Sequence, residues 1–244
     1  MPRLRIQLNV FDEPLVVDEL VPDDPIRLDE ALPFLQQIDE LVVDRAVNQV
    51  KAKGEHVSCA RGCSACCRAQ PVPVTPPEAL ALSRLVESMP AERRAEVETR
   101  FADRVQKLEQ AGLASEFLDR SSELTREQAR QIAERYMALG IVCPFLEEEA
   151  CSIYPHRPFV CRQYLVTSPA ALCRDPLHQP IVRVPMPIRA ASATLATSSA
   201  LMGHPQYTVP LVLSLEYARK HPELERRFES EVVFKHLLRS LVNN

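Results

Sequence analysis

The sequence predicts a mainly α-helical protein: a single helical domain with irregular cysteine-rich metal-binding loops and a short β element at the N-terminus. Three observations favour this class. Apolar residues recur every three or four positions over long segments, two capping boxes mark helix starts, and eight cysteines gather in two groups, the second of them rich in prolines. With 244 residues the chain can bury a large core, so its stability need not depend on disulfides.

The N-terminal part contains the expected β element and the first helix. Residues 4–10 and 15–17 alternate weakly between apolar and polar, which predicts a short strand or hairpin. Over residues 33–53 apolar side chains recur with helical spacing, and Gly54 follows where the end of a helix favours a left-handed residue. This helix should lead the chain into the first cysteine group.

A helical insert is expected between the two cysteine groups, over residues 76–140. The stretch 75-TPPE-78 is a capping box, in which Thr75 and Glu78 satisfy each other's backbone amides, and it predicts a helix to about Ser88. A charged helix should follow over residues 91–110. The capping pattern repeats at 125-TREQ-128, before a helix that ends at Gly140.

The C-terminal part predicts one extended segment and two more helices. Residues 181–189 alternate in polarity, but two prolines make them an edge strand or an extended loop. The C-terminal helices are expected over 209–242, parted near His221. Because no repeat and no linker is visible, the chain is interpreted as one domain, 1–244, with a metal-binding core over approximately residues 55–175.

Charge and hydropathy exclude several classes of protein. Lys and Arg total 29 against 33 acidic residues, so no basic excess favours nucleic acid or an anionic membrane. Charges interrupt the N-terminus at Arg3, Arg5, Asp12 and Glu13, and no apolar run reaches the length of a membrane span. The expected location is cytoplasmic, where clustered cysteines serve as metal ligands more often than as disulfides.

The first cysteine group, 57-VSCARGCSACCRAQ-70, cannot place four thiolates on one ion from a regular helix. At about 1.5 Å of rise per residue, Cys59 and Cys67 would lie roughly 12 Å apart along the axis, whereas thiolates on one metal are about 3.8 Å apart. Three arrangements stay open. Gly62 interrupts the segment as a loop, the ligands divide between two centres, or either Cys66 or Cys67 is not a direct ligand.

The second group, 143-CPFLEEEACSIYPHRPFVCRQYLVTSPAALC-173, has prolines at a density that excludes a continuous helix. A rigid, wandering loop of this kind can wrap a metal. Arginine follows cysteine repeatedly, and nearby cations lower thiol pKa values and offset the charge of thiolates. Arg157 and Arg162 are therefore predicted to contact the metal-ligating cysteines without binding the metal themselves. The acidic run 147–149 is expected to be a solvated loop tip.

The spacing CxxxCxxC at Cys59, Cys63 and Cys66 also occurs in radical-SAM enzymes. That family, however, implies an aromatic residue before the third cysteine, whereas Ala65 stands there, and a long α/β barrel. None of the chain's glycines forms a nucleotide-binding loop such as GxGxxG. The barrel enzyme is rejected on these grounds.

The whole pattern strongly resembles the YkgJ-type cysteine-cluster family, described as zinc- or iron-chelating domains, to which the flagellin lysine N-methylase is related. The resemblance rests on CxxxCxxCC at 59–67, CPFL at 143–146 and CSIYPHRPFVCR at 151–162, about a tenth of the chain. It implies metal-site roles for Cys59, Cys63, Cys66, Cys67, Cys143, Cys151 and Cys161. Cys173 lies outside the matched pattern and is the least secure ligand.

These observations predict a metal-binding protein that holds an iron-sulfur cluster, with 4Fe-4S favoured, or zinc between the two groups. Two alternatives stay open. The methylase resemblance implies SAM-dependent methylation of protein lysine, with a protein substrate as partner, and a zinc site could simply staple a structural or interaction module. His56 and His156 are weaker candidates, each more typical of a surface loop. No catalytic residue stands out.

Overall fold

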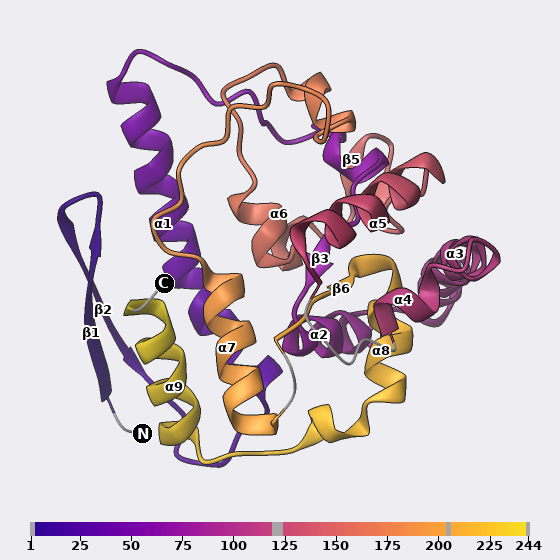
Figure 1. Ribbon diagram of the computed structural model, residues 1–244. Helices are drawn as coiled ribbons and strands as arrows, with labels where there is room; N and C mark the ends of the chain where they lie inside the picture. The colour runs from indigo at the N-terminus through magenta and orange to yellow at the C-terminus, as the bar shows by residue number, and fades with distance from the viewer. Residues whose placement is uncertain (1–2, 119–123, 204–205, 243–244) are drawn as a thin grey trace.

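The computed structural model describes residues 3–118, 124–203 and 206–242, and it confirms a mainly α-helical fold (Figure 1). Within these ranges the helices are α1 (Leu32–Ala52), α2 (Pro76–Glu87), α3 (Ala91–Gln110), α4 (Ala114–Leu118), α5 (Arg126–Ala138), α6 (Phe159–Gln163), α7 (Ala190–Met202), α8 (Ser214–Lys220) and α9 (Ser230–Val242). No helix in the described ranges is both long and apolar enough to cross a membrane.

The strands form three separate antiparallel pairs. Strand β1 (Arg3–Val10) pairs with β2 (Glu13–Leu20), β3 (Pro73–Val74) with β6 (Val209–Pro210), and β4 (Leu146–Glu147) with β5 (Ala150–Cys151). The first pair confirms the predicted N-terminal hairpin. The other two are two-residue contacts that fix loops rather than build a sheet.

The N-terminal half of the core lies between the hairpin and three helices. Hairpin side chains such as Leu8, Val10 and Leu15 are buried, and they belong to the same apolar cluster as residues of α1, α7 and α9. In Figure 1 this body occupies the left and lower centre, with α1 rising from it towards the cysteine loops. The C-terminal helix α9 packs against α7 and so closes this side of the molecule.

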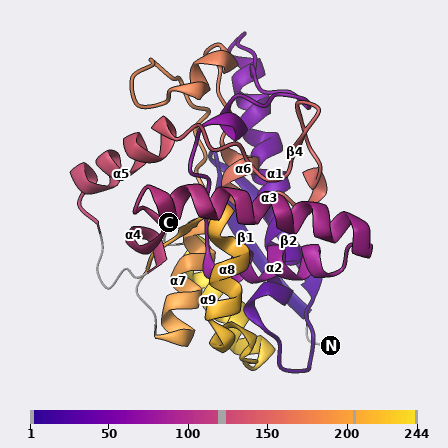
Figure 2. The ribbon, with the colours of Figure 1, turned by 90° about the vertical axis from the view of Figure 1, so that its right-hand side faces the viewer.

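A second body is formed by the helices of the insert together with α8. Helices α2 and α8 pack on each other, and α3 lies across them, as Figure 2 shows. Val97 and Phe101 of α3 are buried in the cluster that also contains Phe145 and Ile153 of the second cysteine group. Helices α4 and α5 add a third cluster around Tyr136. The insert therefore forms part of the core.

The predicted helix starts are confirmed by the caps. Thr75 and Glu78 form the expected reciprocal capping box at α2, and Thr125 and Gln128 form one at α5. Helix α7 was not predicted. Its sequence AASATLATSSALM has no charged face, so it lacks the periodic polarity that marks an amphipathic helix, and it is held by packing against α1, α6 and α9.

One buried carboxylate in α1 should make stability depend on pH. Asp39 is only 1% exposed, its Oδ1 accepts a hydrogen bond of 2.7 Å from Gln163, and its Oδ2 has no hydrogen-bond partner among the described residues. Burial raises the pKa of Asp39 to about 7, against the partial opposition of Arg162. Between about pH 4 and pH 7 the folded state therefore binds a proton that the unfolded state has lost.

Stability should accordingly fall as pH rises through this window, by up to about 1.4 kcal/mol per pH unit. We expect Asp39→Asn to flatten the pH dependence of the free energy of unfolding, measured by urea denaturation. Asp44→Asn is the control, because Asp44 is exposed on the same helix. Equal slopes for Asp39→Asn and the parent protein would contradict the protonation of Asp39.

Candidate metal centre

The first cysteine group folds as a loop after α1. Gly62 has φ of 91° within this loop, and the amide of Cys63 donates to the carbonyl of Ala60 at 2.9 Å. A single 3₁₀ turn, η2 (Cys66–Arg68), then carries the vicinal cysteines. The interruption at Gly62 is therefore present, and the four cysteines do not share one helix.

The four cysteines of the second group lie on or beside three short elements. Cys143 precedes the β4–β5 hairpin and Cys151 ends it. Cys161 lies in α6, and Cys173 lies in the 3₁₀ helix η4 (Ala170–Arg174). Prolines separate these elements, so the thiols can approach a common region from several directions.

Backbone contacts bring the two groups together around η2. The amide of Cys143 donates to the carbonyl of Cys67 at 2.7 Å. On the other side, the Gln70 side chain donates to the carbonyl of Cys173 at 2.7 Å. The first group thus lies between two parts of the second, where the loops meet at the upper end of the molecule in Figure 1.

The thiols form two sets that meet at Cys66. What we call the Cys59 set packs around Ala65 and Val166 and consists of Cys59, Cys63, Cys66 and Cys173. The Cys161 set packs against the second body and consists of Cys143, Cys151 and Cys161. Cys66 is close enough to raise the pKa values of thiols in both sets, although burial is the larger cause. The turn η2 therefore joins the two sets.

All eight cysteines are free thiols, and burial keeps several of them protonated. It raises the pKa of Cys143 to about 12 and that of Cys161 well above the ordinary thiol value. In this conformation no three Cys, His, Asp or Glu side chains of the described residues stand together as a metal site. The all-thiol donor set suits zinc or iron-sulfur, so ligation would have to turn these thiols towards a common ion and release their protons.

The acidic run lies at the tip of the β4–β5 hairpin with Glu148 and Glu149 exposed, as expected, but it also forms ion pairs that the sequence did not predict. Glu147 forms close ion pairs with both Arg93 and Arg100 of α3. Glu149, at the tip of the β4–β5 hairpin, forms a close ion pair with Arg68 of η2. Ion pairs therefore hold the hairpin that carries Cys151 against both the helical insert and the first cysteine group.

The two arginines predicted near the centre have different surroundings. The Arg157 guanidinium carbon lies 3.6 Å from the centre of the Tyr154 ring. Its charge partly opposes the effect of burial, which raises the pKa of Cys151. Arg162 instead donates to the carbonyl of Arg157 at 2.9 Å and pairs with Glu40 of α1 at 2.9 Å. Both candidate histidines, His56 and His156, have exposed side chains.

Glu78 is a residue whose role in the site the sequence did not reveal. Its Oε2 accepts hydrogen bonds of 2.8 Å from the Thr75 amide and hydroxyl, completing the α2 cap. Its Oε1 accepts a 2.8 Å hydrogen bond from the amide of Phe159, the first residue of α6. One buried carboxylate thus fixes two helix starts, and the second of these helices carries Cys161. The capping box was the only signal for it in the sequence.

Residues 58–174 match the model of the CxxCxxCC family, whose description is "Putative zinc- or iron-chelating domain". This stretch includes all eight cysteines, Cys173 among them. Residues 58–174, slightly less than half of the chain, are therefore similar to a cysteine-cluster domain of this kind, as the motifs predicted. No curated protein and no solved structure matches the chain.

Loss of the Glu78 carboxylate should destabilise the fold and free α6. Glu78→Ala leaves the buried amides of Thr75 and Phe159 without an acceptor, at a cost of about 2–4 kcal/mol in urea unfolding. Native-state labelling of Cys161 by a thiol reagent should also become faster. Gln128→Ala removes the same position of the exposed α5 box and should cost less than about 1 kcal/mol. Similar costs for the two variants would contradict this role of Glu78.

Proposed function

We propose that this chain chelates metal through its eight thiols and holds it as iron-sulfur centres. The observation that supports this most is the meeting of both cysteine groups at η2 as reduced thiols. A chain that used these cysteines only for packing would have no need to gather all eight from five separate loops and short elements. The family match over the same residues points to the same class of function.

The two sets favour two centres of four thiolates each. The Cys59 set already contains four thiols, with Cys66 of η2 among them. Cys67, the next residue of η2, would complete the Cys161 set, because its carbonyl accepts a hydrogen bond from the amide of Cys143. In this conformation the two vicinal thiols share a hydrogen bond, which would be lost when they are deprotonated by a metal. Successive side chains of a 3₁₀ turn project about 120° apart, so each of the pair can serve a different set. Four thiolates satisfy either structural zinc or an iron-sulfur cluster.

The surroundings support iron-sulfur. The side chains gathered in the two sets as possible ligands are all thiols, which form a soft, sulfur-only donor set. Arg157 supplies a positive charge near Cys151, which would offset the negative charge of a thiolate-bound cluster. When bound, such clusters supply electron transfer or a cross-link between the loops. The protein's residues hold the thiols in place, and the apolar side chains around them limit access of water.

Protein purified without oxygen should contain iron and acid-labile sulfide, with thiolate-to-iron absorption in the visible region. Two 4Fe-4S centres would give about eight of each per chain. Metal analysis and sulfide determination on the full chain provide the test. Zinc alone, with no cluster after anaerobic reconstitution, would contradict the iron-sulfur proposal and leave a zinc-chelating protein.

Single cysteine variants should distinguish two centres from one. We expect Cys59→Ser and Cys161→Ser each to keep about half of the metal, because each removes a ligand from only one set, and the double variant to keep almost none. Metal content per folded chain is the measurement, with circular dichroism as the check on folding. Complete loss in both single variants would show instead one centre that spans the two groups.

A further inference from the structure

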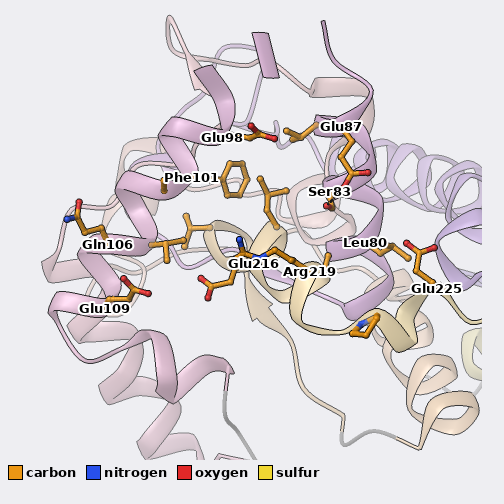
Figure 3. A pocket seen from close by; sticks show the side chains of 17 residues that line it. Leu80, Ser83, Glu87, Glu98, Phe101, Gln106, Glu109, Glu216, Arg219 and Glu225 are labelled. Atoms are coloured by element: carbon orange, nitrogen blue, oxygen red, sulfur yellow. Dashed lines mark hydrogen bonds between the residues drawn. The ribbon is translucent and has the colours of Figure 1, made fainter. Parts of the chain in front are cut away.

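A long groove separates α3 from α2 and α8, on a part of the molecule that contains no cysteine (Figure 3). It encloses about 860 Å³. Its apolar lining includes Leu80, Val86, Phe101, Val105, Val212 and Leu215. Such a groove between helices has the size and the lining of a binding site.

One wall of the groove is a stripe along α3. It is lined by Glu98, Phe101, Ala102, Val105 and Glu109. Phe101 and Ala102 each lie three or four residues from both Glu98 and Val105, and Glu109 follows Val105 by four residues. The stripe therefore runs along one face of three helical turns, about 16 Å. Its centre is apolar, and each end carries an exposed glutamate. A ligand of matching length would place apolar groups in the middle and cations at both ends.

The charged side chains of the groove are mostly acidic. The lining contains Glu87, Glu98, Glu109, Glu216 and Glu225, against the single cation Arg219 among the described residues. Lys220 pairs with Glu216 at 2.6 Å, and Arg84 forms a close ion pair with Glu225. Glu98 forms an exposed ion pair of 3.9 Å with Arg94 of the same helix. Glu87, Glu98 and Glu109 lie along the rim, as Figure 3 shows.

We propose that this groove binds a basic amphipathic helix of a partner protein. An apolar floor in a helix-lined groove is the usual seat for residues at i, i+3, i+4 and i+7 of an incoming helix, and the acidic rim selects lysine or arginine on its flanks. The groove also touches the metal domain. Phe145, two residues after Cys143, lies against the groove wall. Its ring packs edge-on against the Phe101 ring, with the ring centres 5.3 Å apart. The proposal does not depend on which metal the thiols hold.

The binding test uses a fluorescein-labelled 18-residue peptide of leucine and lysine in amphipathic register, titrated with the full chain at about 0.15 M salt. We expect saturable binding by anisotropy, and none for the glutamate version or for a scrambled leucine-lysine peptide. Glu98→Lys/Glu109→Lys should weaken binding at least about tenfold. Glu19→Lys/Glu55→Lys changes the net charge equally at exposed sites outside the groove and should leave binding unchanged. Equal effects of the two double variants, or binding of the scrambled peptide, would overturn the proposal.

A tryptophan reporter locates the peptide. The chain has no tryptophan. Gln106→Trp places one on the groove wall, and its emission should shift to the blue when the peptide binds. Gln131→Trp, on exposed α5, should not respond. A response from Gln131→Trp alone would place the peptide elsewhere.

Sedimentation tests whether a second copy of the chain occupies the groove. We expect a monomer. A dimer that dissociates in the Glu98→Lys/Glu109→Lys variant would identify a second copy as the occupant instead.

Discussion

The buried carboxylate of Glu78 is the constraint on which the rest of the structure depends. It accepts backbone hydrogen bonds at the start of both α2 and α6, and burial raises its pKa although those hydrogen bonds oppose the rise. Helix α6 spans only Phe159–Gln163 and could not persist alone, since isolated helices of this length are unstable in water. Its position follows from what its ends bind.

Helix α6 is bound both to α1 of the N-terminal core and, through Glu78, to α2 of the second body. Gln163 donates to Asp39 of α1, and Arg162 pairs with Glu40 one residue further along the same helix. Cys161, between these contacts and Glu78, is thereby held against the second body. A five-residue helix thus orients one thiol because its polar neighbours are bound on two sides, to α1 and to α2. This arrangement links the metal domain to the N-terminal core.

The sequence was sufficient where the determinants are local. The capping boxes predicted α2 and α5, apolar periodicity predicted α1, and α3 was expected as a charged helix, because these signals lie within or directly beside the helices. Helix α7 was missed because small residues pack on several sides without a polar face. The ion pairs of the acidic run were missed for a different reason. The arginines that bind Glu147 lie about fifty residues earlier, on α3, and no local pattern pairs them.

The same distinction applies to the cysteines. Their number and spacing predicted a metal-binding domain, and the segment that contains them matches the model of a zinc- or iron-chelating domain. Their division into two sets depends on tertiary contacts, such as that of Cys67 with Cys143 and that of Gln70 with the carbonyl of Cys173. Spacing along the chain carries no information on these contacts. The sequence left three arrangements of the first cysteine group open. Only the fold could show which of them apply.

Protonated thiols have a packing role as well as a ligand role. A free cysteine behaves as a small hydrophobic residue, and both sets lie in apolar clusters with residues such as Val166 and Phe145. The helical bodies have their own cores, made of apolar side chains that no metal need hold in place. Metal ligation would therefore act mainly on the loops between these bodies, by exchanging thiol protons for bonds that join η2, α6 and η4.

Helix α3 contacts those loops through its ion pairs to Glu147, and it also forms a wall of the acidic groove. It is thus the element through which a change at the cysteines would reach a partner in the groove.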